Sequence, residues 1–168
     1  MDNDSRHVRA WPAQPYTTLQ LVRTMKRQAP PVLRNFHALA GGFRGDDRLT
    51  ADQRLAMQIR LAKIMGCPVC LWIFPRLAHR RGMAEQQLRA CLDGVGSALE
   101  AETAAVADWA EAVLLGDGAT PPVIPSRCAI LNDRQRAHIQ AMTRVEMCVH
   151  SVGLAFLPNA MIERSRSR

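Results

Sequence analysis

The chain has 168 residues, of which 48% are hydrophobic, and this is enough for one domain with a sizeable core. Its first residues are polar and lack the apolar segment of a signal peptide, and its longest apolar run, residues 67–75, is far shorter than the roughly 20 residues that cross a bilayer. These features predict a soluble, cytoplasmic protein that does not enter a membrane.

The formal net charge of +7 is spread along the chain rather than gathered in one block. A positive excess can favour anionic partners, but a solvated surface explains this pattern more simply, so we do not expect nucleic acid as a partner. Without an export signal, cysteines do not indicate a disulfide framework, because cytosolic reductants keep them reduced. The five cysteines are Cys67, Cys70, Cys91, Cys128 and Cys148.

The N-terminal part predicts an extended arm followed by two helices. Residues 1–16 contain two prolines and no sustained period, and this predicts the arm. Helical spacing begins at Thr17, stops at Pro30, and resumes over residues 32–40 until two glycines end it.

A further helix is predicted between Thr50 and Gly66. Thr50 is a suitable N-cap, and Gln53 three residues later completes a capping box. The next helix would begin at Cys67 as N-cap, because Pro68 suits the first helical position, where its missing N–H does no harm. The residues expected on the buried stripe of the first of these helices are Leu55, Ile59 and Ala62.

The second half of the chain also has helical spacing. The helix from Cys67 should reach about Arg81, followed by helices over residues 84–92 and 99–115 and an irregular loop over residues 116–126. Asn132 or Asp133 would cap a last helix that ends at Gly153 or Pro158. The face expected to be buried in the helix over residues 99–115 consists of Ala101, Ala105, Trp109 and Val113.

Strand signals are nearly absent, so the sequence predicts an all-α fold. We expect a single-domain bundle of about six or seven helices over residues 17–160, preceded by the arm and followed by a basic tail over residues 161–168.

The strongest candidate for a functional centre is the Cys67–Cys70 pair. The positive end of a helix lowers a cysteine pKa from about 8.5 to roughly 3.5–7.5, and a second thiol one turn away can close a disulfide. Such a pair can reduce a peroxide or a disulfide. Two alternatives stay open: a buried structural pair, or a zinc site completed by Cys148 with His150 or His79. Because no second Cys-x-x-Cys exists, we expect no metal and no other cofactor.

Three segments carry a resemblance to a known family: I-R-L-A-K-I-M-G-C-P-V-C at 59–70, R-G-M-A-E at 81–85 and L-N-D at 131–133. Over residues 30–155 the chain resembles the alkylhydroperoxidase D-like / carboxymuconolactone decarboxylase family, in its Cys-x-x-Cys branch. The resemblance implies an all-helical trimer or hexamer and an antioxidant peroxidase activity. It also implies a hydroperoxide as substrate and a thiol donor, either a protein or a small thiol, as partner.

Two positions depart from the pattern of this branch. Its members carry a Glu twelve residues before the first cysteine and a His four residues after the second, and here these positions are Leu55 and Phe74. Neither side chain can titrate, so the family's proton relay is missing there. Two hypotheses follow: a thiol-dependent peroxidase, or a weakened member that acts as a redox-responsive binding or scaffold protein.

Other candidates near the pair have both a functional and a simpler interpretation. Arg60 and Lys63 could stabilise a thiolate or belong to a solvated basic stripe. His79 could transfer a proton, but its distance along the helix favours a surface histidine. Trp72 and Phe74 could line an apolar substrate pocket or belong to the core.

The remaining thiols are expected to have no catalytic role. Cys91 should be buried and inert, whereas Cys128, which follows a proline-rich loop, could be exposed. Helical spacing puts Glu146 and His150 on one face and Cys148 on the opposite face, so we do not expect a triad of these three. Which thiol of the Cys-x-x-Cys pair attacks stays open.

Overall fold

The computed structural model describes residues 48–94, 96–116 and 124–155, together with scattered positions between residues 23 and 38. In this part of the chain it contains five α-helices, two 3₁₀ turns and no strand, which confirms the all-α prediction there. The arm, the tail and most of the two helices predicted between residues 17 and 40 lie outside the described residues. The elements are α3 (Ala51–Ile64), α4 (Pro68–Arg80), α5 (Glu85–Asp93), α6 (Ala101–Leu115) and α7 (Asp133–Ala155), with 3₁₀ turns at Gly96–Ala98 and Ser126–Ile130.

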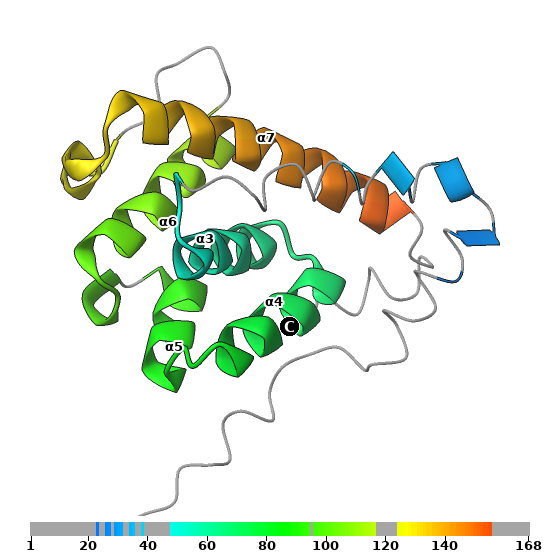
Figure 1. Ribbon diagram of the computed structural model, residues 1–168, viewed down its shortest axis with the longest axis horizontal. Coiled ribbons are helices and arrows are strands. Elements are labelled where there is room, and N and C mark those ends of the chain that lie inside the picture. The colour runs from blue at the N-terminus through cyan, green and yellow to red at the C-terminus, as the bar shows by residue number, and fades with distance from the viewer. Residues whose placement is uncertain are drawn as a thin grey trace, which may run out of the picture.

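Helix α3 lies in the middle of the bundle and packs against each of the other four described helices (Figure 1). One buried cluster, which includes Leu61, Val106 and Ile139, joins α3 to α6 and α7. A second cluster, which includes Ile59 and Ala78, joins α3 to α4 and α5. Because it is covered on both sides, α3 holds the start of α4 and the length of α7 in fixed positions relative to each other.

Reciprocal capping pairs fix where two of these helices begin. The Thr50 hydroxyl accepts the N–H of Gln53, and the Gln53 side-chain oxygen accepts the N–H of Thr50, so the predicted capping box is confirmed. Asn132 and Gln135 make the same two hydrogen bonds at the start of α7, where Asn132 was one of two predicted caps.

Two expectations about burial differ from the structure. Ala101 is exposed, because it is the first residue of α6 and the buried part of that helix begins at Thr103. Cys128 is fully buried in the second 3₁₀ turn, and its thiol donates a hydrogen bond to the carbonyl of Ala105. In addition, α7 continues through Gly153 to Ala155.

The lengths and hydrophobicities of the helices bear on the membrane prediction. Among the described residues, no helix is both long enough and apolar enough to span a bilayer.

Candidate functional site

The Cys67–Cys70 pair lies in the turn that joins α3 to α4. Gly66 has a φ of 62°, a left-handed conformation that glycine adopts without steric cost, and it reverses the chain after α3. Cys67 is then the N-cap of α4, as predicted, and its sulfur accepts the N–H of Cys70 at 3.4 Å. Pro68 occupies the first helical position. The two thiols are hydrogen-bonded with their sulfurs 2.8 Å apart, which is close to the distance of a disulfide.

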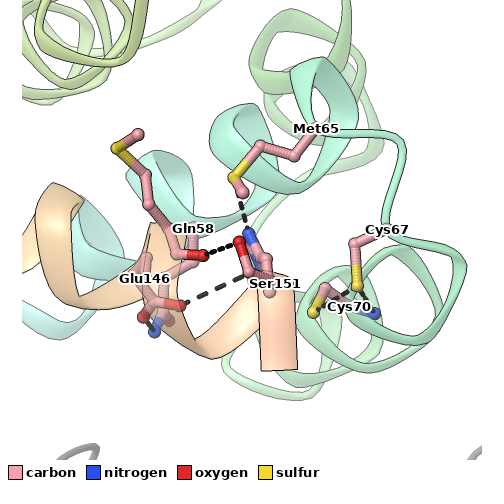
Figure 2. Close-up of polar contacts among 8 residues, drawn as sticks. Gln58, Met65, Cys67, Cys70, Glu146 and Ser151 are labelled. Atoms are coloured by element: carbon pink, nitrogen blue, oxygen red, sulfur yellow. Dashed lines mark hydrogen bonds and ion pairs between the residues drawn. The ribbon is translucent and has the colours of Figure 1, made fainter. Parts of the chain in front are cut away.

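Helix α7 lies beside this pair and carries the acid Glu146 (Figure 2) and the base His150. A ring nitrogen of His150 and the two sulfurs all lie within 4.8 Å of one another. Nδ1 of His150 contacts Sδ of Met65 at 2.8 Å, and Nε2 lies 4.0 Å from Oε2 of Glu146. The other carboxylate oxygen of Glu146 accepts a hydrogen bond from the Gln58 side chain at 2.6 Å. The site therefore combines two thiols, a thioether, an imidazole and a carboxyl group.

Sequence reasoning missed Glu146 as a site residue and considered His150 only as a possible zinc ligand. Their spacing on one face of a helix was visible, and Cys148 is exposed while these two are buried, as that spacing predicted. No local pattern connects that face to a cysteine pair about 80 positions earlier. The zinc alternative named His150 or His79 together with Cys148; of these three, the structure places His150 beside the pair, whereas Cys148 and His79 are exposed.

Burial controls the protonation of the acid and the base. His150 is only 1% exposed, and the loss of hydration lowers its pKa to about 4, so the ring is neutral at pH 7. Burial also raises the pKa of Glu146, although the hydrogen bond from Gln58 acts in the opposite direction. An uncharged imidazole thus lies beside a carboxyl group that binds its proton more tightly than an exposed glutamate does.

The two thiols differ in how easily they lose a proton. The hydrogen bond with Cys67 strongly raises the pKa of Cys70, and burial, the charge of Cys67 and that of Glu146 raise it further. Closely coupled groups lose their protons in two separate steps. Cys70 is therefore a thiol that holds its proton more tightly than an ordinary cysteine does.

Of the two basic residues predicted to assist the thiols, Arg60 binds other partners. The Arg60 guanidinium forms a two-point ion pair with Glu111 of α6, at 2.6 and 2.8 Å, and donates to the carbonyl of Leu92 at 3.0 Å. Lys63 is exposed in the last turn of α3. The structure thus gives Arg60 a role in joining α3, α5 and α6, and thiolate stabilisation by Lys63 stays a prediction.

The other candidates on α4 divide between core and surface. Phe74 is half-buried and packs against the cluster that contains Leu55, so both positions that depart from the family pattern belong to the core. Trp72 is half-buried, and the guanidinium of Arg76 lies 4.6 Å from the centre of its ring. His79 is exposed in the last turn of α4.

Cys91 has the environment that the sequence predicted. It is buried in the cluster between α3 and α5, and burial raises the pKa of its thiol to about 12. A thiol of this kind remains protonated at neutral pH and packs as a small apolar group.

A comparison with protein-family models, with curated proteins and with solved structures gives no match. The fold and the site therefore define the protein by themselves: an all-helical chain, in its described part, with a Cys67–Cys70 pair near disulfide distance at the start of a helix. The chemistry open to such a site is two-electron thiol oxidation or the binding of a soft metal ion.

Proposed function

We propose that this protein is a thiol-dependent oxidoreductase that reduces alkyl hydroperoxides through Cys67 and Cys70. One observation supports the proposal most directly: the two sulfurs are 2.8 Å apart at a helix start, and a ring nitrogen of His150 lies within 4.8 Å of both. The resemblance of residues 59–70, 81–85 and 131–133 to the Cys-x-x-Cys branch of the alkylhydroperoxidase D-like family supports the same reaction and the same all-helical fold.

His150 and Glu146 provide the proton transfer that Leu55 and Phe74 cannot. The neutral imidazole can accept the proton of a thiol within its reach. Glu146, whose pKa is raised by burial, lies 4.0 Å from the ring and can orient the imidazole while it carries that proton. In our proposal, a relay built on α7 replaces one that the family pattern places on the helices before and after the cysteines.

The first step uses Cys67 as the nucleophile, because Cys70 retains its proton. His150 accepts the proton of the Cys67 thiol. The thiolate attacks the terminal oxygen of the hydroperoxide, an S–O bond forms, and the O–O bond breaks. The alkoxide leaves with that proton as an alcohol, and Cys67 becomes a sulfenic acid.

The second step closes the disulfide. The Cys70 sulfur attacks the sulfur of the sulfenic acid, an S–S bond forms, and the S–O bond breaks. The hydroxyl group leaves with the Cys70 proton as water, so two thiols and one hydroperoxide give a disulfide, an alcohol and water. A thiol donor, either a protein or a small thiol, then restores the pair by thiol–disulfide exchange. By the same resemblance we propose a homo-oligomeric assembly.

A single-turnover experiment tests this function. The fully reduced, metal-free protein is mixed with one equivalent of an organic hydroperoxide, and the Cys67–Cys70 disulfide is followed by mass spectrometry. We expect oxidation about 100-fold faster than that of a free thiol, in line with the typical contribution of general acid–base catalysis. In Cys70→Ser, a sulfenic acid should accumulate on Cys67.

Cys148→Ser is the matched control, because it removes an exposed thiol outside the site and should leave the rate unchanged. His150→Asn should slow the oxidation while the pair remains intact. An oxidation rate no greater than that of a free thiol, or a sulfenic acid on Cys70 in Cys67→Ser at the wild-type rate, would contradict the proposed chemistry.

The second candidate function is a redox-responsive binding or scaffold protein. It is favoured by the small exposure of Cys67, 2%, and by the raised pKa of Cys70, both of which slow a reaction with a bulky substrate. This candidate predicts disulfide formation over hours rather than seconds, and it becomes the leading explanation if the single-turnover rate is low.

A further inference from the structure

The site contains more metal-binding atoms than a dithiol reaction needs. Two sulfurs and an imidazole nitrogen lie within 4.8 Å of one another, and they come from two segments about 80 positions apart in the sequence. From this geometry we propose that the reduced protein binds one zinc ion through Cys67, Cys70 and His150. The inference goes beyond the proposed oxidoreductase activity and does not depend on it.

The spacing of the three ligand atoms suits a tetrahedral ion. With Zn–S distances of about 2.3 Å and a Zn–N distance of about 2.0 Å, ligand atoms lie roughly 3.5–3.8 Å from one another. The sulfurs, now 2.8 Å apart, would separate by about 1 Å, a change that one side-chain rotation can produce. The three ligand atoms already lie within 4.8 Å of one another, which is close to the spacing that a tetrahedral zinc ion requires.

Burial of the imidazole gives an independent argument. His150 is almost completely buried, yet its Nε2 has no hydrogen-bond partner in the part of the chain that the structure describes. A buried polar atom without a partner costs stability. An ion bound at one ring nitrogen would fix the orientation of the ring, so that the other nitrogen can donate to a neighbouring acceptor. If Nδ1 binds the ion, Glu146 is placed to accept the N–H of Nε2, as carboxylates do behind many zinc-binding histidines.

The charges and the number of ligands also agree with zinc. A divalent ion neutralises two thiolates, so the loaded site carries no net charge into the interior of the bundle. Three protein ligands leave a fourth position, and Met65 Sδ lies beside the ring at 2.8 Å from Nδ1. Because a thioether is a poor ligand for zinc, we assign that position to water or to a bound thiol compound.

Zinc binding and thiol oxidation would exclude each other. When two thiolates of the loaded site give two electrons to a hydroperoxide, two protons complete its reduction to an alcohol and water, and the sulfurs form a disulfide. A disulfide no longer offers thiolate ligands, so the zinc ion leaves. The loaded and oxidised forms are therefore alternative states of the same pair.

The test is a titration of the reduced, metal-free protein with Zn²⁺ against a competing chromophoric chelator, without oxygen or peroxide. We expect one ion per chain, and X-ray absorption should show two sulfurs at about 2.3 Å and one nitrogen at about 2.0 Å. Cys70→Ser and His150→Asn should each weaken binding by more than about 100-fold. Circular dichroism at each step verifies that the variants are folded.

Cys148→Ser and His79→Asn are matched controls, because they remove an exposed thiol and an exposed imidazole outside the site. Their zinc affinity should equal that of the wild type. The absence of stoichiometric binding, an affinity unchanged in Cys70→Ser, or a coordination shell without sulfur would overturn the inference. Such a result would leave the hydroperoxide experiment unaffected, since that experiment uses metal-free protein.

Discussion

The burial of His150 links the protonation of one side chain to the stability of the fold. Its pKa is about 4 in the folded protein and 6.5 in an exposed chain, so between these values the unfolded chain binds more protons than the folded one. The stability associated with the neutral ring is complete above pH 6.5 and is lost as the pH falls towards 4. The full difference corresponds to about 3 kcal/mol.

We therefore expect the free energy of unfolding of the wild type to decrease by about 3 kcal/mol more than that of His150→Leu between pH 7 and pH 4. Urea unfolding at several pH values measures both. Glu146, Cys67 and Cys70 face the ring and are present in both proteins, so their own titration contributes equally to the wild type and to the variant. The raised pKa of Glu146 changes the stability in the opposite direction, because the stability that goes with its protonated form is lost as the pH rises. Equal pH dependence in the two proteins would contradict this expectation.

At the level of single residues, the sequence predicts what is determined locally. The capping box at Thr50 and the N-cap at Cys67 involve residues three positions apart, and both are confirmed. The contacts of His150 with Met65 and of Glu146 with Gln58 span 85 and 88 positions, so only the packing of the helices reveals them.

Among the helices, Arg60 joins three elements. Its guanidinium binds Glu111 of α6 and the carbonyl of Leu92 near the end of α5. Gly94 ends α5 with a left-handed φ of 74°, and a Cβ atom at this position would collide with the same guanidinium. The glycine thus serves both the helix terminus and the ion pair.

Gly94→Ala should therefore cost more stability than Gly66→Ala, a matched control with a φ of 62° and no atom close to the added Cβ. We expect about 1 kcal/mol from the left-handed backbone in both variants and a further loss of about 1–2 kcal/mol at Gly94, where Arg60 must move. In an Arg60→Met background the further loss should disappear. Chemical denaturation of the double-mutant cycle measures it, and a difference that persists without Arg60 would refute the explanation.

On the scale of the whole molecule, the site depends on how α7 docks against α3 and α6. Ile139 lies in the cluster that joins these helices and is fully buried. Ile139→Ala should lower the free energy of unfolding by about 3 kcal/mol, as large-to-small substitutions in cores do. Ile130→Ala, at a position that is 53% exposed, should change it by less than about 0.5 kcal/mol. A loss in Ile139→Ala as small as that in Ile130→Ala would mean that α7 contributes little to the core.

The sequence predicts the fold class and most helix boundaries because periodicity, caps and glycines act over a few residues. It does not predict the central place of α3, whose two sides face different clusters. Nor does it reveal that Cys128 is buried, since the proline-rich sequence before this residue does not indicate what the 3₁₀ turn packs against.

The separation of the cysteine pair from α7 has a consequence for the order in which the site matures. A ribosome delivers α3 and α4 first and α7 last of the described helices. While α7 is still missing, Cys67 and Cys70 lack the imidazole of His150 and the carboxyl group of Glu146. In our proposal the proton relay is therefore complete only when the last helix docks, and a chain that stops before α7 would carry the Cys-x-x-Cys motif without that relay.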